Sequence, residues 1–279
     1  MKQTPTTNFL IFADDSVVGN IAAYGVIGVV PGLLAETIDS FYSQKVRFGV
    51  EETEILHCKE IFNPEARKKS AWAHLGDRDV IELCRSIASS LSKTIKPLTS
   101  IGFVSLRHMP PGLNLKVPLT SLSPANLPFE KDKKKQALAL ALPAALRPFD
   151  LNLAQIPVEE CLVTLGHDAT KIAWLNSKKR QAHHAATAWV SGFQIQIGQR
   201  GPMLELADMV AYLGAHFVSR SSRFEDAQKV LHWLPPRIWK SSFTPVFFDK
   251  QAINYPPNRR LVGIVEDVTK EFPLPTIET

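Results

Sequence analysis

The chain has 279 residues, of which 45% are hydrophobic and 21% are charged, and its formal net charge is +5. This ordinary composition excludes collagen, coiled coil and disorder as descriptions of the whole chain. The slightly basic balance permits a polyanionic partner without requiring one. The three cysteines have no C-x-x-C spacing, which argues against a disulfide framework or a zinc ribbon.

The N-terminus lacks the basic and apolar regions of a signal peptide. The longest apolar stretch, 21–35, is interrupted by glycines and a proline and is shorter than the roughly 20 residues of a spanning helix. We therefore expect no membrane association and a cytoplasmic location.

The first half of the chain predicts strands that alternate with helices. Residues 8–13 predict a buried strand that stops at two acids, and 21–30 predict a second strand after a turn at Gly19-Asn20. The next predicted elements are a helix over 33–42, a strand over 54–61, and one or two helices over 65–93, broken near Gly76.

The second half begins with a predicted strand over 100–107, followed by a Pro-rich insertion over 108–135. Further predicted elements are a helix over 137–146 kinked at Pro143, strands over 158–165 and 193–197, and a helix over 203–218. This order predicts an α/β domain with a mixed sheet flanked by helices over 1–218. Residues 219–279 are expected to be an irregular extension packed on that core.

The first candidate site is Asp14-Asp15-Ser16, at the end of the first predicted strand. Charges avoid the interior unless they are paired or bound to a metal, so acids at this place suggest a site. An ordinary turn explains the same residues, because Asp and Ser are common in turns.

The second candidate is a polar stripe on the helix 203–218. At about 100° per residue, Glu205, Asp208, Tyr212 and His216 fall on one narrow stripe of an otherwise apolar helix. Such a stripe faces either a metal-filled cleft or water.

Three further residues are candidates on weaker grounds. Asp168 follows the strand 158–165, where an ordinary loop is the alternative. His57 and Lys59 lie two apart on the predicted strand 54–61 and would share a face, although a lone strand histidine is commonly a core residue. Phosphate-binding glycine loops and the G-x-S-x-G motif are absent from the sequence.

In their order, these motifs resemble the domain of unknown function 3800 family, found in bacteria and phages and related to the ribonuclease H-like fold. The family opens with a strand ending in D-E-S-G, which Asp14-Asp15-Ser16-Val17 matches except at Glu and Gly. Its Q-x-A-D mark at the start of a late helix is matched by Glu205-Leu206-Ala207-Asp208, with Glu in place of Gln. The H-x-K-type strand is matched by His57-Cys58-Lys59, and the acid after a central strand by Asp168.

The resemblance covers roughly residues 8–218 and implies metal-dependent phosphodiester chemistry. Clustered carboxylates need protons or divalent cations to neutralise them, and Mg²⁺ or Mn²⁺ prefers oxygen ligands. The implied metal ligands are Asp14, Asp168 and Asp208, with Asp15 and Glu205 in supporting roles. Lys59 would neutralise developing charge on the phosphate, and His57 would shuttle a proton.

Two hypotheses follow from the resemblance. In the first, the protein is a metal-dependent nuclease acting on RNA or DNA, in a mobile-element or phage-defence setting. In the second, the same fold is a binding or regulatory module without turnover. The insertion 108–135 and the extension 219–279 would then offer a surface for a protein partner or a second copy.

Overall fold

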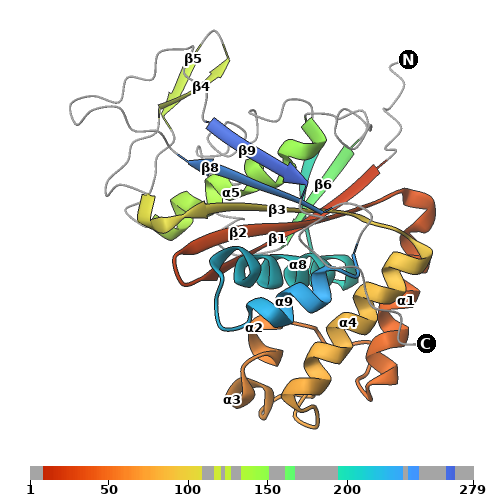
Figure 1. The fold of residues 1–279 in the computed structure, drawn as a ribbon. Coiled ribbons are helices and arrows are strands. Elements are labelled where there is room, and N and C mark those ends of the chain that lie inside the picture. Colours follow the sequence, from red (N-terminus) through yellow and green to blue (C-terminus); the bar gives the residue numbers. More distant parts are fainter. Residues whose placement is uncertain are drawn as a thin grey trace.

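A mixed sheet flanked by helices on both faces forms the core of this computed structural model (Figure 1). The structure describes residues 9–108, 116–120, 123–126, 133–150, 161–166, 194–234, 238–244 and 262–267. The strand order is β7-β6-β1-β2-β3-β8-β9. The strands are β1 (Phe9–Val18), β2 (Ile21–Val29), β3 (Leu98–Ser105), β6 (Cys161–Gly166), β7 (Gln194–Gly198), β8 (Ile238–Thr244) and β9 (Val262–Asp267).

The opening hairpin is longer than its sequence indicates. β1 and β2 pair antiparallel as far as Val18 and Ile21, and the turn at Gly19-Asn20 has the positive φ of 56° at Gly19 that favours glycine. Asp14 and Asp15 therefore lie within the ladder, opposite Gly25 and Tyr24. The expectation that the strand stops before these acids was wrong, and so was the alternative that they form a turn.

The later strands extend this hairpin on both sides. β3 pairs antiparallel with β2, whereas β6 pairs parallel with β1 and β7 pairs parallel with β6. β8 pairs parallel with β3 and carries β9 antiparallel at the edge. The C-terminal extension is thus not irregular throughout, because two of its segments are strands of the main sheet.

Two helices pack on opposite faces of the sheet, α8 (Pro202–Ser219) on one and α5 (Lys133–Asp150) on the other (Figure 1). Each approaches the sheet at a glycine. A Cβ built on Gly25 would lie 2.1 Å from the backbone nitrogen of Ala211 in α8, and one built on Gly102 would lie 2.1 Å from that of Ala145 in α5. The absence of a side chain at these positions lets the helix backbones contact the strands directly.

The remaining helices gather on the α8 side of the sheet (Figure 1). They are α1 (Leu34–Arg47), α2 (Cys58–Ile61), α3 (Pro64–Arg67), α4 (Asp77–Thr94) and α9 (Phe224–Leu231), with 3₁₀ turns at Pro31–Leu33 and Leu106–His108. The predicted break near Gly76 is confirmed, since Gly76 precedes the first residue of α4. The predicted strand over 54–61 was wrong, because its second half is the short helix α2.

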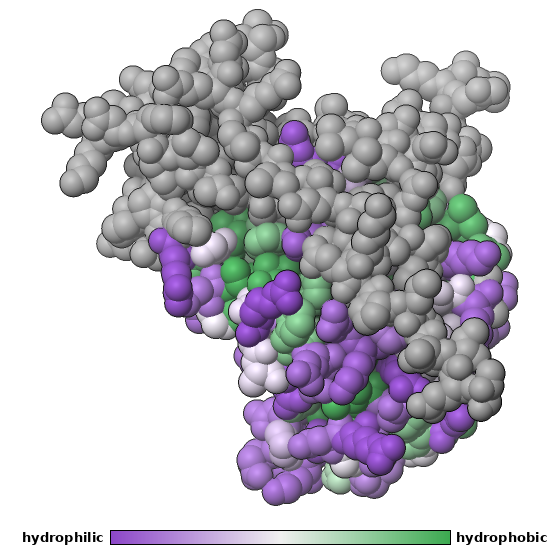
Figure 2. Space-filling model, in the orientation of Figure 1, coloured by the Kyte–Doolittle hydropathy of each residue, from purple (hydrophilic) through white to green (hydrophobic). Residues whose placement is uncertain are grey.

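The insertion contributes a small separate hairpin, β4 (Lys116–Thr120) with β5 (Ser123–Asn126). In the orientation of Figure 1, Figure 2 shows a mostly hydrophilic surface where α2, α3 and α4 lie. Within the described ranges, no helix is both long and apolar enough to cross a membrane.

The close approach of the helices to the sheet generates a prediction. We expect Gly25→Ala to destabilise the protein by about 1–3 kcal/mol or more, because the added methyl overlaps the α8 backbone. Gly32→Ala is the matched control, since a Cβ there meets nothing within 4 Å. Urea unfolding of both variants measures the difference, and equal stabilities would contradict the packing described.

Candidate functional site

Helix α8 buries the N-terminal half of the polar stripe that its sequence predicts. The helix begins after Gly201 with Pro202 at its first position, where the missing N–H of proline costs nothing. Glu205 and Asp208 are both only 4% exposed. The alternative that this part of the stripe is a solvated face was therefore wrong.

The two carboxylates accept hydrogen bonds from backbone N–H groups just before α2 and at its first residue. Glu205 Oε2 accepts from Leu56 N at 2.8 Å, and Asp208 Oδ2 accepts from Cys58 N at 2.7 Å. Asp208 Oδ2 also lies 3.3 Å from Nδ1 of His57, whose side chain is 29% exposed. Residues far apart in the sequence thus meet in one buried polar contact.

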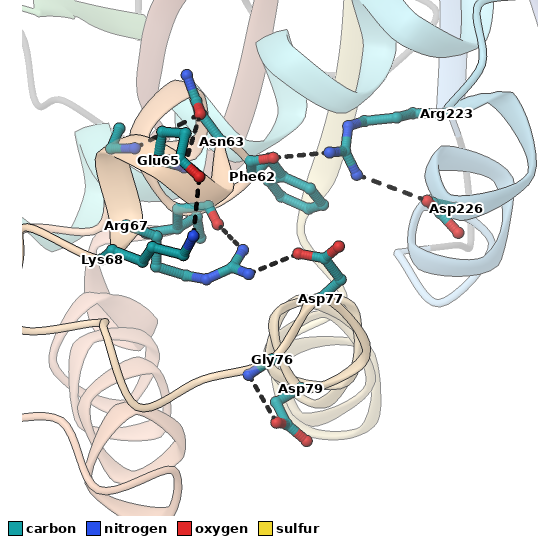
Figure 3. Close-up of polar contacts among 12 residues, drawn as sticks. Phe62, Asn63, Glu65, Arg67, Lys68, Gly76, Asp77, Asp79, Arg223 and Asp226 are labelled. Carbon is teal, nitrogen blue, oxygen red and sulfur yellow. Dashed lines mark hydrogen bonds and ion pairs between the residues drawn. The ribbon is translucent and has the colours of Figure 1, made fainter.

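Arginines satisfy the opposite end of α2. Arg67 Nη1 donates to Ile61 O at 2.5 Å, and Arg223 Nη2 donates to Phe62 O at 2.6 Å (Figure 3). The ends of a helix carry partial charges, positive at the N-terminus and negative at the C-terminus. Here a negative carboxylate lies at the positive start of α2, and positive guanidinium groups lie at its negative end. These contacts compensate for the small number of hydrogen bonds that a single helical turn makes.

Acidic side chains hold these arginines in place. Arg67 Nη2 lies 2.5 Å from Asp77 Oδ1, and Arg223 Nη1 lies 3.8 Å from Asp226 Oδ2 (Figure 3). The hydrogen bond from Arg67 lowers the pKa of Asp77. The first turns of α4 and α9 therefore orient the groups that close α2.

The rest of the stripe contacts the same region through aromatic rings. Tyr212 stacks on Phe62 with ring centroids 5.2 Å apart. The ring centroid of His216 lies 4.5 Å from that of Tyr212, and its Nδ1 lies 2.5 Å from Ser221 Oγ. Burial raises the pKa of Tyr212 to about 12 and lowers that of His216 to about 4. Three residues of the stripe, Glu205, Asp208 and Tyr212, thus contact the segment 56–62, and His216 contacts Tyr212 and Ser221.

Asp14 lies on the same face of the sheet as α8. Asp14 is paired with Gly25, and a Cβ built on Gly25 would point into the α8 backbone. Asp14 Oδ1 lies where it would be 2.8 Å from a Cβ built on Gly166. Successive strand residues point to opposite faces, so Asp15 lies on the α5 face with Tyr24. The two neighbouring acids therefore belong to different sides of the sheet.

The other predicted site residues are placed as follows. His57 precedes α2 and Lys59 lies within it, exposed, so the expected shared strand face does not exist. Asp168 lies outside the described residues.

The described residues do not by themselves fit a three-ligand metal site. Across the described ranges, no group of three or more His, Cys, Asp or Glu side chains could hold a metal ion. Asp208 Oδ2 is already engaged by the Cys58 N–H and by His57.

Sequence reasoning missed a buried cation that faces Glu205, Lys45 in α1. Its Nζ lies 3.6 Å from Glu205 Oε2, and its side chain is fully buried. The signal was present in the helix spacing, because Thr37, Phe41 and Lys45 are four residues apart and are the buried positions of α1.

Searches of family models, curated proteins and solved structures find no match to this chain.

The backbone role of Asp208 can be tested by comparing two substitutions. Asp208→Asn retains an oxygen that can accept from Cys58 N, whereas Asp208→Ala leaves this buried N–H without an acceptor. We expect the Ala variant to be less stable than the Asn variant by about 1–3 kcal/mol in urea unfolding. Equal stability of the two variants would show that Cys58 N–H does not depend on this carboxylate.

The lowered pKa of His216 predicts a pH dependence. The pKa is about 4 in the folded protein against an ordinary 6.5, so the unfolded chain takes up the proton first as the pH falls. The free energy of unfolding therefore includes a stabilising contribution from neutral His216 that is fully present above pH 6.5 and is lost as the pH falls toward 4. Thermal unfolding at pH 7 and pH 4.5 should therefore show a larger loss in the unsubstituted protein than in His216→Gln, which cannot titrate.

Proposed function

We propose that this protein is a hydrolase of phosphodiester bonds in RNA or DNA, in which His57 moves a proton and Asp208 orients its ring. The observation that carries the proposal is the contact between Asp208 Oδ2 and His57 Nδ1 at 3.3 Å. A buried carboxylate on one ring nitrogen selects the tautomer and leaves the other nitrogen for proton transfer. The partial exposure of His57 agrees with access for a substrate.

The position of Asp14 supports a site on this face. β1, β6 and β7 run parallel, and β6 and β7 end at Gly166 and Gly198, level with Asp14. Ligands of open α/β sheets bind outside the carboxyl ends of such strands. The exposed Arg200 follows β7, and a guanidinium is a group suited to binding phosphate.

Membership of the domain of unknown function 3800 family, with a ribonuclease H-like sheet, is part of this proposal. It is supported by the opening hairpin that carries Asp14 and by the motif Glu205-Leu206-Ala207-Asp208 in the first turns of a late helix. The nucleic-acid substrate comes from this resemblance, and the net charge of +5 is compatible with it.

The resemblance also adds Mg²⁺ or Mn²⁺, held by Asp14, Asp168 and Asp208. The described residues do not make such a ligand set, so the proton transfer proposed above involves only His57 and Asp208. Asp15 has no part in it, because it lies on the other face of the sheet.

A binding module without turnover is the second candidate. It is favoured by the engagement of Glu205 and Asp208 with backbone N–H groups, which gives both carboxylates a structural role. Such a module would bind nucleic acid and leave it intact.

The proposal is tested by incubating the protein with labelled RNA and DNA, with Mg²⁺ or Mn²⁺ and with EDTA. We expect cleavage that His57→Gln reduces by about 100-fold or more, because a proton-transfer group contributes roughly 10²–10⁴-fold. Asp39→Asn, an exposed acid on α1, is the control and should retain full activity. Asp14→Asn tests the metal separately.

Each outcome separates the candidates. Cleavage that is unchanged in His57→Gln contradicts the proton-transfer role of His57. Cleavage that persists both in EDTA and in Asp14→Asn excludes a metal-dependent mechanism. Binding without cleavage by the unsubstituted protein supports the second candidate instead.

A further inference from the structure

Lys45 is a fully buried lysine whose hydrogen-bonding capacity is used by one short segment and one carboxylate. Its Nζ donates to Glu52 O at 2.8 Å and also to Glu54 O, and it lies 3.6 Å from Glu205 Oε2. The ammonium group thus donates two hydrogen bonds to carbonyl oxygens and forms an ion pair with one carboxylate. Since burying an unpaired charge is strongly unfavourable, these partners are the condition for placing a lysine here.

Aromatic rings surround the same ammonium group. Nζ lies 5.4 Å from the ring centroid of Phe41, 5.5 Å from that of Tyr42 and 6.0 Å from that of Trp72. Cations are attracted to such ring faces, and the attraction increases when water is excluded. Trp72 also donates from Nε1 to Ile55 O at 3.3 Å, so it holds the same segment as Lys45 does.

Glu205 binds the same segment through a backbone N–H group. It accepts from Leu56 N at 2.8 Å while it pairs with Lys45. Burial raises the pKa of Glu205 and lowers the pKa of Lys45, and their mutual attraction opposes both shifts. The charge that Glu adds in place of the Gln of the resembled motif is therefore matched by Lys45, whereas Lys59 is exposed on α2.

We propose that Lys45 and Glu205 act as a positioning pair, which fixes residues 52–58 and thereby places His57 against Asp208. Lys45 donates to the carbonyl groups of Glu52 and Glu54 at the start of the segment, and Glu205 accepts from the N–H of Leu56, next to His57. Residues 52–57 belong to no helix or strand, so side chains supply the bonds that regular structure supplies elsewhere. A catalytic group must be held within about 0.5 Å of its productive place, and this pair provides such support.

The test is a cycle of Lys45→Met, Glu205→Gln and the double variant, read by amide hydrogen exchange in the full chain. Each single substitution leaves one buried charge without its partner, and breaking a buried pair costs enough to change an equilibrium by about 100-fold or more. We expect exchange at Leu56 and Cys58 to accelerate by about this factor in each single variant. Lys45→Met/Glu205→Gln buries no charge but lacks the lysine bonds to Glu52 O and Glu54 O, so exchange should be slower than in either single variant and still about tenfold faster than in the unsubstituted protein.

A second readout concerns catalysis and rests on the proposed function. Misplacing His57 should lower kcat by about 10–100-fold with little change in KM, because small displacements from productive geometry are costly. The double variant should recover only part of that loss, because it has no unpaired buried charge but still lacks the lysine bonds to the segment.

The outcomes are distinguishable from a failure of the proposed hydrolase activity. The positioning pair is overturned if amide exchange at Leu56 is no slower in the double variant than in the single variants. It is also overturned if the double variant does not fold. If the single variants do not fold, a folded double variant with a protected Leu56 supports the pair. If the exchange cycle behaves as expected while His57→Gln retains full cleavage, the pair stands and the proton-transfer role of His57 is wrong.

Discussion

Two buried carboxylates of α8 accept the backbone N–H groups of Leu56 and Cys58, and the local structure of the site depends on this interaction. Without an acceptor, each of these buried donors would cost about 1–3 kcal/mol. A charged acceptor makes a stronger bond than a neutral one, and it also complements the positive end of the short helix that follows. The interaction thus orders a segment that continues into a short helix, where the sequence predicts a strand.

Charge is balanced around this contact by groups from several elements. Lys45 of α1 faces Glu205, His57 faces Asp208, and Arg67 and Arg223 close the far end of α2. Lys45, Arg67 and Arg223 each contact both a backbone carbonyl and an acid, so none of these three cations relies on a single partner. This arrangement explains how a stripe of polar residues can be buried on an otherwise apolar helix.

The same contacts bear on function in two ways. They present His57 at the surface with one ring nitrogen against a carboxylate, which is an arrangement suited to proton transfer. They also occupy an oxygen of Asp208 that the resemblance assigns to a metal ion. Asp14 lies on the same face of the sheet, and Asp15 on the other, which narrows the acids that one site can use.

The sequence by itself determined the α/β class, the opening hairpin with its turn at Gly19-Asn20, and the helix that carries Glu205 and Asp208. These features depend on local hydrophobic spacing and turn chemistry, which are visible in one dimension. Only the tertiary structure decided that residues 58–61 are helical, because the acceptor for the first N–H of this helix, that of Cys58, lies in α8, about 150 residues later in the chain. It also decided that β1 continues through Asp14 and Asp15 and that the polar stripe is buried, since strand pairing and the partners of a helix face are long-range. The buried Lys45 is an intermediate case: its spacing marks the inner face of α1, but the carboxylate that allows it to be there is known only from the fold.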